Sequence, residues 1–141
     1  MDFSRYENLR ALVRANFSET TQRLVDEALE YADGKLAGVC RYDGAPMLDH
    51  AAAVASIVIS EVGLGRNSAV SSILHDVVRL AHKERPADEF LALTEEIRNR
   101  FGEQVVGITM GLANISELKL KTSKEQADNF RDLIVSYSED P

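Results

Sequence analysis

The sequence predicts an all-α fold in a single domain, and three observations lead to that prediction. Apolar residues recur every three or four positions along most of the chain, as they do on one face of a helix. The 8 glycines and 3 prolines fall mostly between these periodic segments. The alternation of a half-buried strand is nearly absent. With 141 residues the chain is long enough for one helical bundle with its own core, over residues 1–141.

The expected helices follow from periodicity and from capping signals, taken in chain order. Ser18 predicts the start of the second helix, Asp49 that of the third and Asn67 that of the fourth, because their short polar side chains accept hydrogen bonds from free N–H groups. Gly63 predicts the end of the third helix. We expect helices over residues 3–16, 19–36, 49–62, 68–79, 94–101 and 103–113, and a last one from about residue 123.

Two later segments are expected to be irregular. Residues 80–92 contain Pro86, which predicts a mobile loop with His82 in solvent. Residues 117–122 form the one alternating patch, and we expect a loop there too. Ser123, with Gln126 three residues later, is typical of the capping box that opens a helix.

Composition excludes several classes of protein. The net charge of −7 argues against direct nucleic-acid binding, which relies on Lys and Arg contacts to phosphates. No apolar run reaches the roughly 18 residues of a membrane span, and the N-terminus lacks a secretory signal. The single cysteine, Cys40, excludes an internal disulfide and suits a reducing compartment. We therefore expect a cytoplasmic protein that binds neither membrane nor nucleic acid.

The chemistry concentrates in an apolar helical run, residues 71–78, that is interrupted by His75 and Asp76, with His50 one helix earlier. A buried polar group must find a hydrogen bond or a metal ion, or it costs about 1–3 kcal/mol. Both side chains can reach one ion above the helix face, and His50 can approach from the other side if the two helices pack antiparallel. Two imidazoles and one carboxylate suit a divalent ion such as Mn, Fe or Zn. A hydrogen-bonded group without metal is the alternative.

The order and spacing of these residues resemble a known family. His50, followed 25 residues later by His75 and Asp76, is similar to the signature of the HD phosphohydrolases. The surrounding segments resemble the N-terminal HD domain of the RelA/SpoT alarmone enzymes. This resemblance covers roughly residues 24–141 and is carried by residues 28–32, 41–50, 73–78, 95–97, 101–106 and 126–131.

The resemblance implies a function and a set of site residues. The RelA/SpoT family makes and degrades guanosine 3′,5′-bis-pyrophosphates, and its HD domain removes the 3′ pyrophosphate with a bound manganese ion. By resemblance His50, His75 and Asp76 are three ligands of that ion, and Arg41 contacts the guanine base. The fourth ligand and the synthetase domain are expected beyond Pro141, so the chain is expected to be truncated before both.

Basic side chains are further candidates for contact with the nucleotide's phosphates. Lys35 lies near the expected metal ligands in sequence context and is one such candidate. Lys119, Lys121 and Lys124 are expected in a solvated loop instead.

The sequence also departs from the family's pattern. Active hydrolases carry an acidic pair where this chain has Arg79 and Leu80, and Tyr42 and Ala51 replace the family's usual basic residue and proline. A cation close to the metal opposes both metal binding and base function. The preferred interpretation is therefore a hydrolysis-impaired, regulatory HD domain. The alternatives are an active manganese-dependent pyrophosphohydrolase, an HD hydrolase for another nucleotide, and a helical interaction module.

Overall fold

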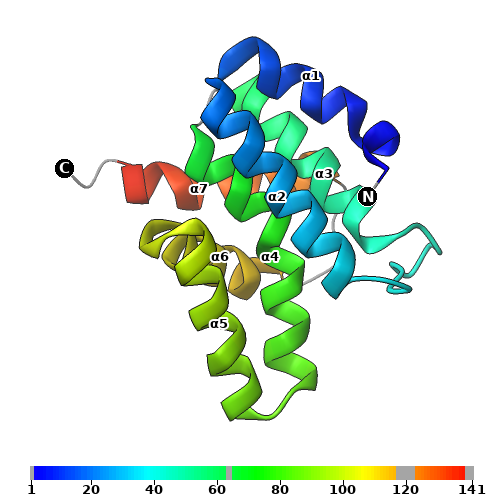
Figure 1. The fold of residues 1–141 in the computed structure, drawn as a ribbon, viewed down its shortest axis with the longest axis vertical. Coiled ribbons are helices and arrows are strands. Elements are labelled where there is room, and N and C mark those ends of the chain that lie inside the picture. The colour runs from blue at the N-terminus through cyan, green and yellow to red at the C-terminus, as the bar shows by residue number, and fades with distance from the viewer. Residues whose placement is uncertain (1, 63–64, 117–122, 139–141) are drawn as a thin grey trace.

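The computed structural model describes residues 2–62, 65–116 and 123–138, and within these ranges the chain is helical with no β-strand (Figure 1). The one strand-like pairing in these ranges is an isolated bridge between Cys40 and Pro46. This confirms the predicted all-α class. The elements are η1 (Phe3–Tyr6), α1 (Glu7–Asn16), α2 (Glu19–Lys35), α3 (Met47–Ile57), η2 (Val58–Val62), α4 (Arg66–Glu84), α5 (Ala87–Phe101), α6 (Glu103–Ser116) and α7 (Ser123–Ser138).

The bundle is built around α4. Every residue from Ser68 to Val78 is buried, so this helix has no solvent-facing side over three turns. A helix whose side chains are apolar or small on every face can be packed against other helices on every side. The structure uses that property, since α2, α3, α5 and α6 all pack against α4.

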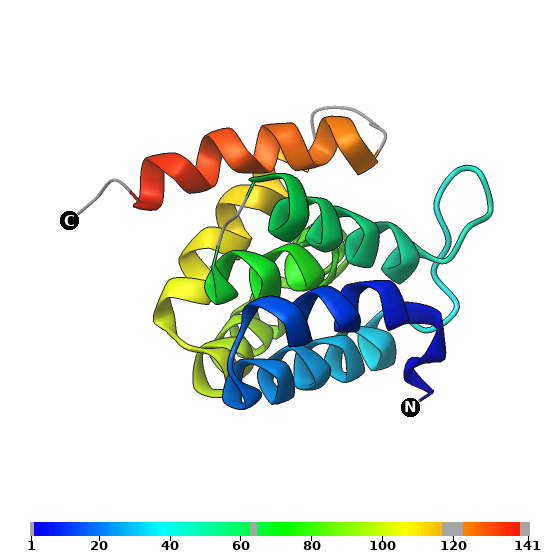
Figure 2. The ribbon, with the colours of Figure 1, turned by 90° about the horizontal axis from the view of Figure 1, so that it is seen from above.

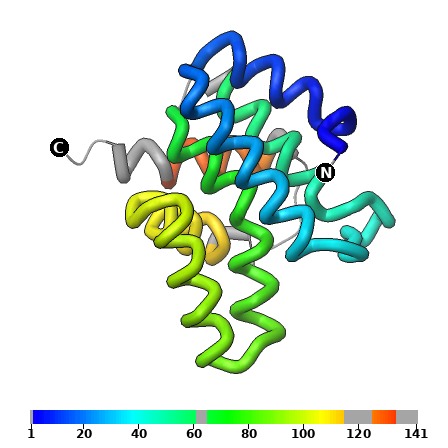
Figure 3. The backbone as a smooth tube through the Cα atoms, in the orientation of Figure 1, coloured from blue at the N-terminus to red at the C-terminus, as the bar shows by residue number. Residues whose placement is uncertain are grey.

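The other helices form layers on either side of α3 and α4. Seen from above, the α1–α2 pair lies on one side and α7 on the other (Figure 2). The main core contains residues of every helix from α1 to α6, and a smaller cluster connects α3, α6 and α7. The members of that smaller cluster are Val54, Val58, Ile108, Leu112, Ala127 and Phe130. The segment between α2 and α3 leaves the body of the bundle as an extended loop (Figure 3).

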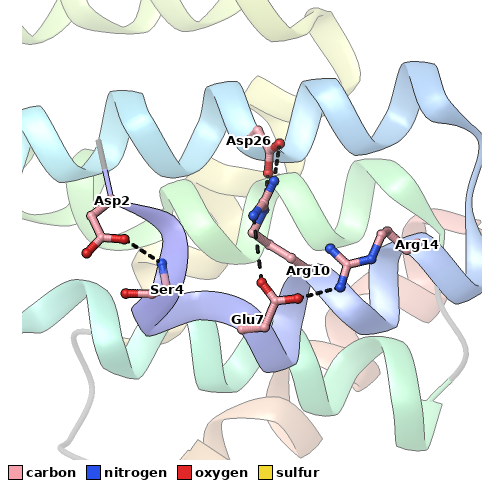
Figure 4. Close-up of polar contacts among 6 residues, drawn as sticks. All are labelled: Asp2, Ser4, Glu7, Arg10, Arg14 and Asp26. Carbon is pink, nitrogen blue, oxygen red and sulfur yellow. Dashed lines mark hydrogen bonds and ion pairs between the residues drawn. The ribbon is translucent and has the colours of Figure 1, made fainter.

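The α1–α2 pair is fixed by a cap and by ion pairs at its surface. Ser18 caps α2 as predicted, because its hydroxyl accepts a hydrogen bond from the Thr21 amide at 3.3 Å. Arg10 of α1 donates two hydrogen bonds to Asp26 of α2, at 2.9 and 3.1 Å. Glu7 lies between Arg10 and Arg14 and pairs with both (Figure 4).

The expected loop over residues 80–92 is wrong. Helix α4 continues to Glu84 and α5 begins at Ala87, so only Arg85 and Pro86 separate them. Proline is tolerated before the first turn because its missing N–H is not needed there. The acidic Asp88 and Glu89 favour the same helix start, where the partial positive charge of the dipole lies. The short helix predicted from Thr94 is thus the second half of α5.

This correction also moves His82. It lies in the last turn of α4, exposed, with its ring 5.1 Å from the ring of Phe90. The predicted exposure is confirmed, and the predicted loop is not.

Two of the predicted caps are wrong as well. Asp49 lies inside the first turn of α3, after Pro46, and its carboxylate accepts hydrogen bonds from Arg5 at 2.5 Å and from Tyr6 at 3.3 Å. Asn67 lies inside α4 and donates to Gln104 of α6 at 2.6 Å. In both cases a tertiary partner takes the polar group that was expected to cap its own helix. Helix α6 also runs past Asn114 to Ser116.

Several predictions fall outside the described part of the chain. These are the end of the third helix at Gly63, the loop over 117–122 with Lys119 and Lys121, and the side chains of Ser123 and Lys124. Among the described residues, none of the helices combines the length and apolar character needed to cross a membrane.

Candidate metal centre

The packing of α3 against α4 brings the three predicted ligands together. His75 and Asp76 lie midway along α4 and are 1% and 2% exposed. His50 lies in the first half of α3 and is partly buried. Each residue offers one ligand atom, and these atoms lie within 4.8 Å of one another. The sequence spacing therefore identified a real cluster, which the fold assembles from two neighbouring helices.

The orientation of His75 is set by its own helix. Its Nδ1 lies 2.6 Å from the carbonyl oxygen of Ser72, so Nδ1 carries the hydrogen and donates it. The lone pair of Nε2 then faces Asp76, with Oδ1 at 3.3 Å. A nitrogen lone pair and a carboxylate oxygen repel at this distance unless a proton or a metal ion lies between them. The arrangement thus favours a positive charge between the two residues.

Phe130 of α7 closes the centre on one side. Its ring is fully buried and meets the His75 ring nearly at right angles, with 4.9 Å between the ring centroids. The His50 ring lies on another side of His75, with a centroid distance of 6.2 Å. Water is thereby kept from much of the His75 imidazole.

The two carboxylate oxygens of Asp76 differ in their hydrogen bonding. Its Oδ1 accepts a hydrogen bond from Arg79 Nε at 2.8 Å. Its Oδ2 is buried and has no hydrogen-bond partner among the described residues. Burial opposes ionisation of this carboxyl, but the nearby His75 and Arg79 outweigh it and hold the pKa of Asp76 below its usual range. Asp76 is thus a buried anion with an unused oxygen.

The residues present fit a divalent metal ion. Two nitrogen donors and one carboxylate suit a transition ion, and the unused Oδ2 of Asp76 is a ligand atom without another role in the described residues. Burial, followed by the charge of Arg41, lowers the pKa of His50 to about 4. His50 is therefore neutral at physiological pH and offers a lone pair, so no proton has to leave it when a metal binds.

The structure separates the two predicted nucleotide contacts. Arg41 lies in the loop between α2 and α3, where its guanidinium is 5.5 Å from the centre of the Tyr42 ring and its charge acts on His50. Lys35, at the end of α2, points its ammonium at Glu96 of α5, 3.8 Å away. Arg41 is therefore placed with the centre, whereas Lys35 is engaged with another helix.

The departures from the hydrolase pattern also have distinct positions. Arg79 turns towards the centre and binds Asp76, and its Nη2 lies 3.8 Å from the sulfur of Met47. Leu80 is half-buried and packs against the main core. Neither position places a carboxylate at the centre.

Sequence reasoning missed three residues that shape the centre: Ser72, Met47 and Phe130. The first follows from helix geometry, since the carbonyl three residues before a helical histidine is within its reach. The contacts of Met47 and Phe130 join helices far apart in the chain and leave no signal in a single sequence.

The chain belongs to the HD domain family, whose sequence model matches residues 28–141. HD domains bind divalent metal ions, and a group that could hold one, His50, His75 and Asp76, is present in this chain. Within that family the chain is related to the RelA/SpoT proteins of guanosine tetraphosphate metabolism, which confirms the resemblance predicted from the sequence.

Three relatives illustrate the relationship. The chain is 32% identical over 117 residues to the guanosine-3′,5′-bis(diphosphate) 3′-pyrophosphohydrolase of Aquifex aeolicus. The aligned region covers 83% of this chain and 15% of that relative. The chain is 33% identical over 104 residues to the Haemophilus influenzae protein of the same name, covering 73% and 14%. It is 29% identical over 121 residues to the GTP pyrophosphokinase of Myxococcus xanthus, covering 83% and 15%. The chain thus spans about 15% of the length of these relatives.

Proposed function

We propose that this HD domain binds a guanosine 3′,5′-bis(diphosphate)-type nucleotide at the metal centre and hydrolyses it poorly, so that it serves a regulatory role. The observation that carries the proposal is the combination of an intact His50, His75 and Asp76 group with a cation at position 79. The names of the relatives supply the nucleotide class.

The metal part of the proposal rests on the three donors. His50, His75 and Asp76 would hold a manganese ion, which would polarise a phosphoryl oxygen and acidify a bound water. Ser72 supports this role by fixing the His75 hydrogen on Nδ1, so that Nε2 is available as a ligand.

The proposed impairment follows from the groups at positions 79 and 80. A general base must accept a proton from the attacking water, and neither a guanidinium nor an isobutyl group can do so. Arg79 is bound to the buried carboxylate of Asp76, and Leu80 is packed against the core. In the proposed function, therefore, neither side chain activates the attacking water.

Arg41 is the proposed contact for the nucleotide. Its side chain is partly buried beside the exposed Tyr42 ring, and its charge acts on His50. A guanidinium can stack on a base and bind phosphate oxygens, and both contacts suit this nucleotide class. The contact of Lys35 with phosphate stays a prediction, since its ammonium pairs with Glu96.

The test measures binding and turnover of guanosine 3′,5′-bis(diphosphate) with Mn²⁺ in the wild-type chain, in His75→Ala and in His82→Ala. His82 is the matched control because it is an exposed histidine on the same helix. We expect binding with little or no turnover, loss of binding in His75→Ala and no change in His82→Ala. Absence of binding in the wild-type chain would refute the proposal.

An active pyrophosphohydrolase is the second candidate, favoured by the completeness of the three-residue group and by the unused oxygen of Asp76. Turnover that disappears in His75→Ala and persists in His82→Ala would establish it. A role in controlling a synthetase domain is the corresponding proposal for the regulatory candidate, and it requires nucleotide binding without turnover.

A further inference from the structure

We propose that Arg79 is a tethered counter-ion of the metal centre: its guanidinium competes with a divalent metal ion for Asp76 and keeps the affinity for that ion low. The inference rests on the metal centre of the proposed function, but it concerns the metal alone and involves no nucleotide. In this proposal the partly buried guanidinium compensates the negative charge of Asp76, as a metal ion would otherwise do.

The geometry places the guanidinium on the ligand itself. Arg79 follows Asp76 by three residues on α4, and its Nε donates to Oδ1 at 2.8 Å. That oxygen is also the one facing His75 Nε2, at 3.3 Å. The guanidinium therefore holds the oxygen nearest His75, so a metal ion would have to displace it there or bind through Oδ2 of the same carboxylate.

Burial makes this competition strong. The Asp76 side chain is 3% exposed and that of Arg79 is 15% exposed, so water screens their charges weakly. A nearby cation opposes a second cation for the same reason that it stabilises the carboxylate. An ion that binds Oδ1 must displace the guanidinium, and one that binds Oδ2 must still overcome the repulsion from it.

The charge balance leads to the same conclusion. The two histidines contribute no charge when they bind a metal through neutral imidazole, and Asp76 is the carboxylate of the described cluster. Arg79 cancels that negative charge. The three ligands and Arg79 together thus carry a net charge near zero, whereas the ligands without Arg79 would carry one negative charge.

The guanidinium is also held in place by packing. Its Nη2 lies 3.8 Å from Met47 Sδ, at the start of α3. Arg79 therefore bridges the two helices that carry the ligands, His50 on α3 and Asp76 on α4. This bridge keeps the centre assembled without an ion.

The experiment titrates Mn²⁺ alone into the wild-type chain, Arg79→Gln and Arg98→Gln, with binding followed by calorimetry and by the electron paramagnetic resonance of free Mn²⁺. Arg98 is the matched control, because it also pairs with a carboxylate three residues earlier on its helix, Glu95, but at the surface of α5. We expect Arg79→Gln to bind Mn²⁺ at least about tenfold more tightly than wild type. Arg98→Gln should match wild type.

A double variant separates competition from a general change in charge. In Asp76→Asn the carboxylate is gone, so Arg79→Gln added to it should bring at most a small further gain. Equal or weaker Mn²⁺ binding in Arg79→Gln than in wild type would overturn the proposal, as it would show that the guanidinium positions Asp76 for the metal.

A second measurement uses the unaltered chain and does not depend on the folding of a variant. If Arg79 already compensates Asp76, removal of metal with EDTA should change the thermal midpoint of wild type by no more than about 2 °C. A large fall in the midpoint would contradict the inference. A failure of nucleotide binding, in contrast, would refute the proposed function and leave these metal measurements unaffected.

Discussion

Two arginine–carboxylate pairs in this protein have nearly the same shortest N–O distance but differ in burial. Arg10 and Asp26 join α1 to α2 with an N–O distance of 2.9 Å, and Arg79 and Asp76 pair within α4 at 2.8 Å. The first pair has side chains 28% and 30% exposed, and the second 15% and 3%. The two pairs therefore differ in the burial of their side chains and not in their N–O distance.

The difference in burial changes what each pair contributes. Water can replace either partner of the α1–α2 pair, so its net contribution to stability is small. Asp76 has little access to water, and losing its partner would leave a buried charge uncompensated. The more exposed pair therefore adds modestly to the packing of two helices, whereas the buried pair gives Asp76 the counter-ion that its burial requires.

The largest effect should come from removing the ring that covers His75, the neighbour of the buried pair. Phe130→Ala deletes a fully buried ring beside His75, and we expect a loss of about 4 kcal/mol in the free energy of unfolding. Urea unfolding followed by far-UV circular dichroism measures it. Leu133→Ala, a partly buried position on the same helix, is the control and should cost clearly less. Equal costs would mean that Phe130 has no special place in the core.

The next effect tests the buried pair directly. Arg79→Gln in the absence of metal should lower the free energy of unfolding by about 3 kcal/mol, since it leaves Asp76 buried without its counter-ion. The double variant with Asp76→Asn should recover part of that loss. The same urea measurement, made in EDTA, gives both values. A cost no greater than that of Arg10→Gln would remove the distinction between the two pairs.

The surface pair should respond weakly. Arg10→Gln is expected to cost about 1 kcal/mol, the upper range for a pair with two hydrogen bonds at a partly exposed site. High salt should reduce this cost, because exposed charges are screened. Unfolding of wild type and variant at low and high NaCl concentration tests the point. A cost that is unchanged by salt would contradict the surface assignment.

The smallest effect concerns Glu7, which is exposed and paired with Arg14. The hydrogen bond from Arg14 lowers the pKa of Glu7. The sign follows: the pair stabilises the fold above the ordinary glutamate pKa, and this contribution disappears as the pH falls through the lowered value in the folded protein. Thermal midpoints of wild type and Glu7→Gln should thus differ slightly at pH 6 and converge as the pH is lowered through the folded-state pKa. A difference that grows on acidification would contradict the assignment.

The sequence was sufficient for features that depend on local spacing. The three-residue group was predictable because His75 and Asp76 are neighbours on one helix, His50 lies on the preceding helix, and this order resembles the HD signature. Ser18 was a reliable cap because its acceptor acts within one turn. Even the pairing of Arg79 with Asp76 agrees with the spacing of three residues on a helix. These contacts need little knowledge of the tertiary structure.

Features that depend on tertiary contacts were not predictable. Pro86 predicts a loop, but the buried Leu93 and Ile97 hold the whole segment in a helix against the core. Asn67 and Asp49 were expected to cap their own helices, and each found a partner on another one. A single sequence shows which groups are polar, but it does not show which distant group will meet them.

The edge-to-face contact between His75 and Phe130 has a spectroscopic consequence. Aromatic ring currents displace the resonances of protons held close to the ring, so the carbon-bound protons of the His75 imidazole should resonate away from their positions in an unfolded chain. Because Phe130 belongs to α7 and His75 to α4, this displacement depends on the docking of one helix on the other. Proton NMR of the imidazole region would therefore report, without any added label, whether α7 is packed over His75.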